Sequence, residues 1–405
     1  MRTRYGVSPW VFQYPDSRRP DFPPARGELA ASVVIVGGGL TGCATAYACA
    51  AAGLRPIVLE AGRIGQGGTG RSAGLLLPDP GPSFRQVAGA HGLRAARTAF
   101  QSWRRASLDA AALLRRLGIR CGLDPQDSLI VASGDDEKAF ARELTARMEA
   151  GLEVTRLRRR QLLAAAALDA AGAMKMRDAF GLDPYRACLG LAGAAVRRGA
   201  VIFEKTPVVK VRFGRRDVTV TAERAVVTAD RVLVTTGTAT PEFRQLRRHF
   251  DRRESYLVLT EPMPAAMRRA VGLRAATVAD MRVPPHRIRF TADDRILVAG
   301  AAQPEQPSRR RDAILVQRTG QLMYELLTMY PAISGLMPAF GWERVYGETA
   351  DGLPYIGPHR NFPRHLFALG GASESVTGAF LAARILVRYL QDAVEKPDLV
   401  FSWTR

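Results

Sequence analysis

The 405-residue sequence has little of what disulfide scaffolds, metal centres and membrane spans require. Its four cysteines form no CxxC pair, so we predict packed free thiols rather than a disulfide or a metal site. The five histidines are scattered without an HxxxH or HxH pair, and no metal is predicted. No window reaches the roughly 18 unbroken apolar residues of a membrane span. The first residues (MRTRYGVSPW) have no apolar run typical of a signal peptide, and we therefore expect a cytoplasmic protein.

Lysine is scarce, although the net charge is +20. Only five of the 58 basic residues are lysines, and the arginines are spread along the whole chain. A nucleic-acid-binding protein more often concentrates basic residues with aromatic ones on a single element. The pattern argues against a nucleic-acid partner but leaves open the attraction of an anionic substrate or another anionic partner.

The chain is long enough for two closely connected domains. Short β-branched runs typical of buried parallel strands occur near both ends and in the middle, as at Ser32–Val36 and Arg231–Thr235. Between Gly237 and Ala339 the strands look antiparallel. These patterns predict a discontinuous dinucleotide-binding domain, with the chain passing in and out of a second, mixed α+β domain.

A GxGxxG motif lies directly between a predicted buried strand and a predicted helix. Gly37 permits a tight turn, Gly39 lets the backbone approach a pyrophosphate, and Gly42 lets the helix pack against the strand. A pyrophosphate is stabilised at the helix N-terminus by free N–H groups and the helix dipole. Glu60 ends the next strand, where a carboxylate accepts hydrogen bonds from the adenosine ribose. This context predicts a dinucleotide site.

A second glycine-rich loop follows at residues 67–74 (GGTGRSAG). An NAD domain has no use for such a loop at this place, whereas the longer FAD molecule must run past it to place its ring. The second loop therefore favours FAD.

Five segments together resemble the D-amino acid oxidase superfamily of FAD-dependent oxidoreductases. In pattern they are nearest to the glycine oxidase and γ-glutamylputrescine oxidase-like members. The resemblance spans nearly the whole chain in the right order. The segments are residues 33–60, 67–74, 182–211 (LDPYRACLGLAGAAVRRGAVIFEKTPVVKV), 234–237 (VTTG) and 349–357 (TADGLPYIG).

The resemblance implies an α/β plus α+β fold. A discontinuous, glutathione-reductase-like (Rossmann-type) FAD-binding domain would be joined to a second domain, whose antiparallel sheet holds the substrate against the flavin. We expect residues 1–95, 182–242 and 340–405 in the FAD-binding domain, with 1–30 as an irregular N-terminal arm. Residues 96–181 and 243–339 would form the substrate domain.

The family pattern also implies which residues bind FAD, which we expect to be held non-covalently. Gly37, Gly39, Gly42 and Glu60 would bind the ADP half, Val208 would meet the adenine and Gly237 the ribose. The segment 370–378 would lie along the flavin, and its N–H groups and helix dipole would stabilise negative charge on the reduced ring. The remaining expected ligands are Thr69, Arg71, Ser72 and Gly74 around the pyrophosphate and ring, and Gly371, Ser375, Val376 and Thr377 along the flavin.

Three positions depart from the family pattern. The arginine that often clamps the substrate carboxylate is Tyr346 here, which argues against a simple α-amino acid substrate. The cysteine that attaches the flavin in covalent members is Arg344. The lysine that promotes reaction with oxygen in some members is Thr377, which leaves oxidase and dehydrogenase chemistry both open.

Candidate substrate contacts come from two predicted strands and from the T-x-D motif. Strand alternation places Arg287 and Arg289 on one face, and Arg289 matches an arginine of the putrescine-type relatives. Arg289 is therefore our candidate anion contact, with a solvated strand arginine as the alternative. Tyr346 would lie beside this anion, and Glu348, if it faces the pocket, would favour a cationic amine. Tyr256 is either a site residue or core packing.

The sequence thus predicts an enzyme that oxidises a C–N bond of a small amine or N-substituted amino acid. Hydride would pass to flavin N5, and the electrons would go on to O2 or another acceptor. Oxidation of a hydroxy acid or another C–H donor is the alternative reaction. A flavin-bearing protein associated with nucleic acid is a weaker alternative, suggested only by the charge.

Overall fold

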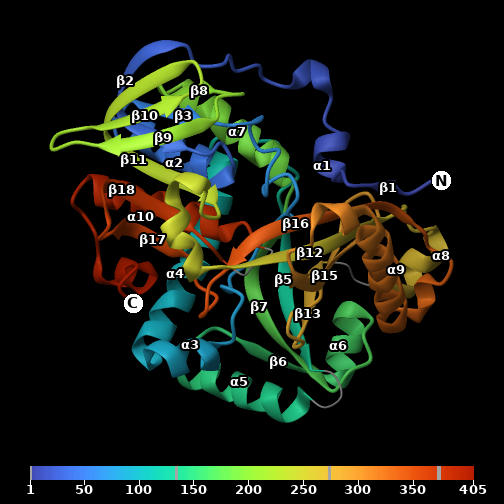
Figure 1. Ribbon diagram of the computed structural model, residues 1–405. Coiled ribbons are helices and arrows are strands. Elements are labelled where there is room, and N and C mark those ends of the chain that lie inside the picture. The colour runs from blue at the N-terminus through green and yellow to red at the C-terminus, as the bar shows by residue number, and fades with distance from the viewer. Residues whose placement is uncertain (1, 133–135, 272–274, 372–374) are drawn as a thin grey trace.

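The computed structural model describes residues 2–132, 136–271, 275–371 and 375–405, and it contains two large sheets (Figure 1). Strands β18, β11, β2, β3 and β8 of the eight-stranded sheet are parallel neighbours in that order, and β17 adds an antiparallel edge. Its strands are β2 (Gly27–Val36), β3 (Pro56–Leu59), β8 (Val201–Phe203), β9 (Val208–Phe213), β10 (Val218–Ala222), β11 (Ala225–Gly237), β17 (Tyr355–His359) and β18 (Phe362–Leu369).

The second sheet has ten strands and is mostly antiparallel. Two of its pairs are parallel, β13 with β5 and β1 with β16. The strands are β1 (Arg4–Tyr5), β4 (Leu75–Leu76), β5 (Asp124–Ala132), β6 (Thr155–Arg158), β7 (Gly172–Gly181), β12 (Asp251–Thr260), β13 (Ala276–Asp280), β14 (Arg287–Phe290), β15 (Ile296–Pro304) and β16 (Pro338–Glu348). The predicted fold class, a parallel dinucleotide-type sheet with a second sheet of antiparallel type, is confirmed.

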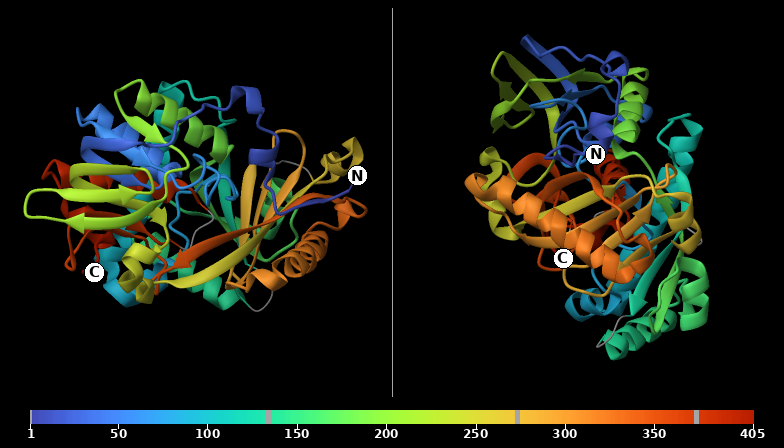
Figure 2. Two further views of the ribbon diagram at one scale, coloured as in Figure 1. Left: turned by 45° about the horizontal axis from the view of Figure 1, so that its top comes forward. Right: turned by 90° about the vertical axis from the view of Figure 1, so that its right-hand side faces the viewer.

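Helices surround both sheets (Figures 1 and 2). The α-helices are α1 (Pro9–Phe12), α2 (Leu40–Ala51), α3 (Phe84–His91), α4 (Leu93–Arg116), α5 (Glu137–Glu149), α6 (Arg159–Ala166), α7 (Pro184–Val196), α8 (Ala265–Val271), α9 (Arg311–Met329) and α10 (Thr377–Leu390). Short 3-10 helices are η1 (Asp16–Arg18), η3 (Pro241–His249), η4 (Ser308–Arg310), η5 (Pro331–Ile333) and η6 (Lys396–Phe401). No helix of the described residues is both long and apolar enough to cross a membrane.

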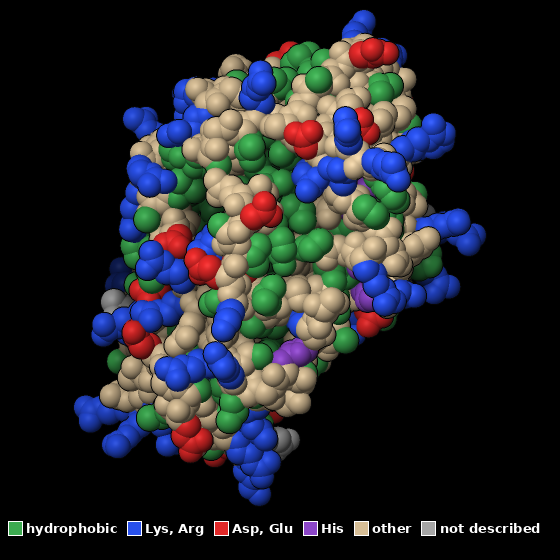
Figure 3. Space-filling model, turned by 90° about the vertical axis from the view of Figure 1, so that its left-hand side faces the viewer, with side chains coloured by type: hydrophobic (Ala, Val, Ile, Leu, Met, Phe, Trp, Pro, Cys, Tyr) green, Lys and Arg blue, Asp and Glu red, His purple; other side chains and the backbone are tan. Residues whose placement is uncertain are grey.

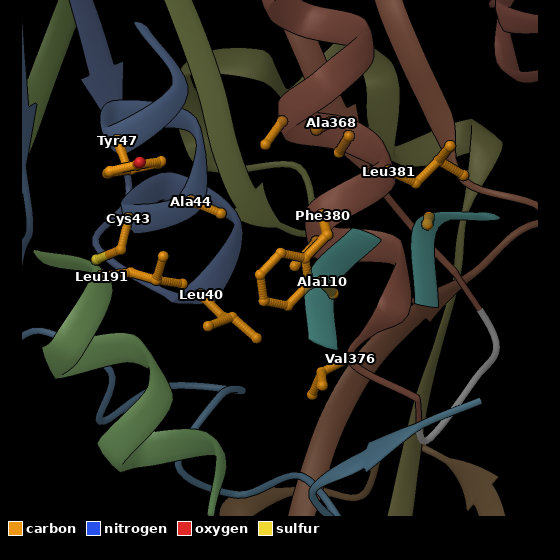
Figure 4. Close-up of a cluster of buried hydrophobic side chains, with 14 of the residues drawn as sticks. Leu40, Cys43, Ala44, Tyr47, Ala110, Leu191, Ala368, Val376, Phe380 and Leu381 are labelled. Atoms are coloured by element: carbon orange, nitrogen blue, oxygen red, sulfur yellow. The ribbon is translucent and has the colours of Figure 1, made fainter. Parts of the chain in front are cut away.

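The parallel sheet is buried on both faces, which explains its unbroken β-branched runs. On one face α2, α7 and α10 pack closely because their facing residues are small or aliphatic. Figure 4 shows this contact, with Leu40 and Cys43 on α2 next to Leu191 on α7, and Phe380 on α10. The other face packs on the β9–β10 hairpin and η3. The sheet is therefore a rigid base for the strand ends that carry the site.

The ten-stranded sheet is covered on one face by α9, which lies across the strands in the right-hand view of Figure 2. Side chains of β12 and β15 alternate between two cores, and β14 contributes Ile288 and Phe290 to the first of them. Tyr256, Val258 and Ile288 face α9, whereas Leu257 and Leu297 face Ala73 and its neighbours in the second glycine-rich loop. One face of this sheet is therefore turned toward the dinucleotide-type sheet.

Some segments lie elsewhere than the predicted domain limits suggest. Strand β16 belongs to the ten-stranded sheet, although the limit at residue 340 groups most of it with the FAD-binding domain. Helix α4 packs on α10, in the core beneath the parallel sheet. The arm 1–30 is also less irregular than expected, because it contains β1, α1 and the start of β2. The division into domains at the stated residues stays a prediction.

All four cysteines are buried and free. Cys43 on α2 and Cys188 on α7 lie with their sulfur atoms 3.6 Å apart. The two sulfur atoms lie 3.6 and 3.7 Å from the carbonyl oxygen of Gly38. Burial raises the pKa of Cys49 to about 12 and, as the first of several causes, that of Cys121 to about 11. Within the described ranges no group of three or more His, Cys, Asp or Glu side chains is arranged to hold a metal ion.

Candidate functional site

The first glycine-rich loop joins β2 to α2 so tightly that a larger residue cannot enter it. A Cβ atom on Gly42 would lie 1.9 Å from the carbonyl oxygen of Gly37. Gly37 itself has φ +107°, a conformation that favours glycine. The Thr235 hydroxyl, at the end of the neighbouring strand β11, donates to the carbonyls of Val36 and Gly37. The loop is held from both sides and leads directly into a helix N-terminus.

Glu60 lies at the end of β3 and faces this loop. Its Oε2 accepts a hydrogen bond from the Gly38 amide at 2.6 Å, and its Oε1 accepts one from the Gly62 amide at 2.8 Å. Helix α2 has no side-chain cap at Gly39, but its first amide, on Leu40, donates to the Thr69 hydroxyl at 2.8 Å. The two glycine-rich loops therefore meet at the start of α2, where an anion is stabilised by the helix dipole.

A cavity of about 680 Å³ extends from these loops to the ten-stranded sheet. We call the part lined by Gly37, Glu60 and Val208 the β3 end, and the part lined by Arg344, Tyr346 and Gly347 the β16 end. Its lining combines loop backbone, strand ends and helix N-termini. Such a site suits a long cofactor that carries both a phosphate group and an apolar ring.

Two buried polar atoms in the cavity wall have no hydrogen-bond partner among the described residues. They are Nε1 of Trp103, on α4, and Oγ1 of Thr240, just after β11. Buried polar groups are normally paired, and a donor left without a partner costs free energy. A bound ligand with polar groups would supply the missing partners. The cavity therefore fits FAD.

Most of the predicted FAD-binding residues line this cavity, including Gly37 and Glu60 at the β3 end. The others that line it are Gly39, Thr69, Ser72, Val208, Gly237, Gly371, Ser375 and Val376. Residues 372–374 of the predicted flavin segment lie outside the described residues. Helix α10 begins at Thr377, within the last residues of this segment.

Four predicted FAD-binding residues are not part of the cavity lining. Gly42 supports the loop from behind. Arg71 points to β16, where its Nη1 pairs with Glu343 at 2.5 Å. Gly74 lies against Arg289 and the Leu182 carbonyl, which leaves no room for a side chain. The hydroxyl of Thr377 exchanges hydrogen bonds with the backbone of Leu77 and is fully buried.

At the β16 end, Arg344 and Tyr346 both line the cavity. They are two residues apart on one strand and therefore share a face. The Arg344 guanidinium lies 5.6 Å from the centre of the Tyr346 ring. Glu348, the third residue of this alternation, pairs with Arg253 at 2.8 Å and does not line the cavity. The predicted effect of Glu348 on a substrate amine has no support in this arrangement.

Tyr256 faces the opposite side of its sheet. It packs in the core beneath α9, where its hydroxyl donates to Glu254 and accepts a bond from Gln303. Of the two predicted alternatives, core packing is the correct one. The reason is strand alternation, since Leu257 and not Tyr256 faces the second glycine-rich loop.

Arg289 was predicted to contact a substrate anion, but its side chain binds backbone carbonyls instead. It is buried, and its Nη1 donates to three carbonyl oxygens, those of Ala73, Gly74 and Leu182, at 2.7–3.0 Å. It does not line the cavity. The strand face was predicted correctly, because Ile288 and Phe290 face α9 and Arg289 faces the glycine-rich loop. However, the loop occupies the guanidinium that was expected to bind a substrate anion.

Several lining residues were not predicted from the sequence. Trp103 comes from a long amphipathic helix, and its apolar stripe does not distinguish a cavity wall from a core. Arg252 lines the cavity but is paired with Glu305. Thr235 and Thr236 end a parallel strand beside the glycine loop, which is the kind of position where ligands bind. Their position at the strand end could have identified these two threonines as candidate ligand contacts.

Basic side chains do not gather into one patch on the face drawn in Figure 3. Lysines and arginines are scattered around it, with acidic groups among them. Many arginines are paired, as Arg104 is with Glu153 and Asp178. This face offers no continuous basic track for a nucleic acid backbone.

The chain matches the family model described as "FAD dependent oxidoreductase" (DAO) over residues 32–389. It is 28% identical over 400 residues to a probable oxidoreductase, OrdL, of Haemophilus influenzae (92% of this chain, 86% of that protein). It is 25% identical to the γ-glutamylputrescine oxidoreductase of Escherichia coli (91% and 86%). It is 26% identical to the glycine oxidase of Bacillus licheniformis (87% and 92%).

Solved structures share the fold. The glycine oxidase of Geobacillus kaustophilus superposes with a TM-score of 0.78 at 23% identity, over 93% of this chain and 99% of that one. An L-amino acid deaminase of Proteus vulgaris gives 0.77 at 15% identity, over 96% and 100%. With the glycine loops, Glu60 and the elongated cavity in place, the family match identifies the chain as an enzyme that uses FAD: it belongs to the DAO family of FAD-dependent oxidoreductases.

Proposed function

We propose that the enzyme oxidises a C–N bond of a small amine or N-substituted amino acid. FAD, when bound, supplies the acceptor for the hydride at its N5 atom. One observation carries the proposal: a single cavity joins the dinucleotide loops to a face of the ten-stranded sheet that presents Arg344 and Tyr346. A substrate held on that face would lie beside the cofactor in the same enclosed space.

The cavity chemistry supports hydride transfer without a protein nucleophile or base. Among the described residues that line it there is no histidine, lysine or cysteine, and the only carboxylates are Glu60 and Glu242. Glu60 is engaged by two backbone amides. The role left to the protein is to bind, orient and exclude water, which fits transfer of hydride from a neutral amine.

We further propose that the substrate carries an anionic group that contacts Arg344, with the Tyr346 hydroxyl as a second donor. Arg344 takes the place that the sequence suggested for Arg289, because the carbonyls of Ala73, Gly74 and Leu182 already hold Arg289. A guanidinium pairs bidentately with a carboxylate, and a tyrosine adds one directed bond. A substrate with a carboxylate fits this pair of side chains.

The electron acceptor is O2 or another oxidant. Thr377 stands at the family's lysine position and carries no positive charge. Its hydroxyl is hydrogen-bonded to the backbone of Leu77. Oxygen consumption measured against dye reduction separates the two acceptors. The cytoplasmic location stays a prediction from the sequence.

Anaerobic reduction of the purified yellow protein tests the reaction. We expect amines or N-substituted amino acids to bleach the flavin band under argon, and hydroxy acids of matched size to leave it unchanged. Bleaching by hydroxy acids alone would establish the alternative reaction instead.

The anion contact is tested by steady-state kinetics of Arg344→Met and Tyr346→Phe on whichever substrate reduces the flavin. We expect kcat/KM to fall at least tenfold for Arg344→Met, since a charged hydrogen bond is lost. Arg212→Met, at an exposed arginine of β9, is the matched control and should change nothing. A value within threefold of wild type for Arg344→Met would disprove the contact.

A further inference from the structure

Four successive peptide carbonyls in the second glycine-rich loop accept hydrogen bonds from side chains outside the parallel sheet. This loop segment, residues 71–74, lies between Thr69, which caps α2, and strand β4. Its donors are two indoles and one guanidinium. The bonds run from Trp342 Nε1 to Arg71 O (2.9 Å), from Trp10 Nε1 to Ser72 O (2.9 Å), and from Arg289 Nη1 to Ala73 O (3.0 Å) and Gly74 O (2.7 Å).

The three donors come from segments that are far apart in the sequence. Trp10 is on α1 in the N-terminal arm, Arg289 is on β14 and Trp342 is on β16. In Figure 1 the dark blue arm crosses from β2 to the ten-stranded sheet, where β1 pairs with β16. The arm therefore extends beyond the parallel sheet and reaches the loop from the side of the ten-stranded sheet.

The donors also support one another. The Arg289 guanidinium is buried and lies 5.5 Å from the centre of the Trp10 ring. Nearby carboxylates act on it through their charge and not through hydrogen bonds. A buried cation without a hydrogen-bonded carboxylate needs other oxygen atoms to replace water. Here the carbonyls of Ala73, Gly74 and Leu182 do so. The cation and the carbonyls thus hold one another in place.

Glycines make this close approach possible. Gly74 has φ +67°, and a Cβ atom there would lie 2.2 Å from the Leu182 carbonyl and 2.8 Å from Arg289. A Cβ atom on Gly70 would lie 2.9 Å from the side chain of Val11, which follows Trp10 on the arm. The arm is therefore in van der Waals contact with the loop at Val11 and Gly70.

The loop in turn shapes the cavity, since Thr69 and Ser72 line it. Trp342 precedes Arg344 and Tyr346 by two and four residues on β16, so one strand holds the loop and also presents side chains to the cavity. We propose that Trp10, Trp342 and Arg289 are positioning residues for FAD, and that the arm is a working part of the cofactor site. The inference rests on FAD binding and not on the identity of the substrate.

Trp10→Phe tests the proposal, because it removes the indole donor and keeps an aromatic ring over Arg289. We expect the dissociation constant for FAD to rise about three- to tenfold, the effect of one lost hydrogen bond. The visible absorption band of the bound flavin should shift as the loop relaxes. Trp342→Phe should give the same two changes and provides an independent variant if Trp10→Phe does not fold.

Trp403→Phe is the matched control. Trp403 stacks on Tyr355, its Nε1 has no hydrogen-bond partner among the described residues, and it does not line the cavity. We expect wild-type FAD affinity and spectrum from this variant. Unchanged affinity and spectrum in both Trp10→Phe and Trp342→Phe would overturn the proposal. Equal changes in Trp403→Phe would also overturn it, because they would assign the effect to general packing.

Discussion

The two ends of the cavity are built in different ways. At the β3 end, the loop from Gly37 to Gly42 and the carboxylate of Glu60 belong to one strand–helix–strand unit, and backbone amides make most of the contacts. At the β16 end, the arm, the loop 71–74 and β16 come together from distant parts of the chain, and side chains make the contacts. The first end is therefore fixed by local geometry and the second by tertiary packing.

This difference has a consequence for tolerance to substitution. A site built from tightly packed backbone cannot accept a new Cβ atom, but substitution of most neighbouring side chains changes it little. A site made of side chains can change its specificity through one or two substitutions while the fold persists. We expect the β3 end to respond in an all-or-none way and the β16 end to respond gradually. Four variants or measurements test this contrast.

The largest effect is expected from Gly42→Ala. The new methyl group would lie 1.9 Å from a backbone carbonyl that cannot move without opening the loop. Overpacking of this kind costs about 1–3 kcal/mol or more. We expect the protein to purify without its yellow cofactor. Gly320→Ala makes the same change within helix α9, where nothing lies within 4 Å, and should keep full FAD content. A yellow Gly42→Ala protein would contradict the all-or-none view.

Glu60→Arg should follow. The variant loses a charge-assisted hydrogen bond worth about 1.5–3 kcal/mol and adds an unpaired cation near the Gly38 amide. The dissociation constant for FAD should rise about ten- to a hundredfold by titration of the apoprotein. Glu28→Arg makes the same change in charge at an exposed position of β2 and serves as the control. Wild-type affinity would mean that Glu60 is only a strand-end carboxylate.

A smaller effect, dependent on pH, is expected at Asp351, which follows β16 and does not line the cavity. Burial alone would raise the pKa of Asp351, but hydrogen bonds and charge from Arg405, with smaller contributions from Leu353 N–H and His91, lower it to about 2. The unfolded chain has a pKa of about 3.9. The ion pair therefore stabilises the fold above about pH 4, and this contribution disappears as the pH falls toward 2.

Asp351→Asn tests this assignment. Allowing for partial exposure, we expect the variant to lose about 1–2 kcal/mol of unfolding free energy at pH 7. The difference from wild type should shrink between pH 4 and pH 2 in urea titrations. A difference that stays constant across this range would show that the carboxylate charge is not the cause.

The last prediction is that FAD is not covalently attached to the protein. The family's attachment position holds Arg344, and none of the described lining residues is a cysteine or histidine. Acid precipitation should release all yellow colour to the supernatant. Colour in the pellet would show that the β16 end holds its cofactor by a bond that no residue in the lining suggests.

The same contrast explains what the sequence could predict. Gly37, Glu60 and the strands around them follow from a motif in which spacing alone determines geometry. Tyr256 and Arg289 could not be placed in the same way. The strand pattern gives the two faces but not the partner of each side chain. Two of the three carbonyls that hold Arg289 belong to a loop more than 200 residues away. Strand β16 was missed because its polar side chains face a cavity and weaken the apolar alternation.

The pair of thiols beneath the first loop provides the molecule with an internal reporter. Cys43 and Cys188 join α2 to α7 under Gly38, and neither sulfur is accessible to solvent. A thiol reagent can reach them only when α2 and α7 separate beneath the dinucleotide loop. Such a separation is a local opening of the structure. The other two cysteines are equally sealed, so the closed protein gives little background. The rate of thiol labelling therefore measures how often α2 and α7 separate, and bound FAD should lower this rate.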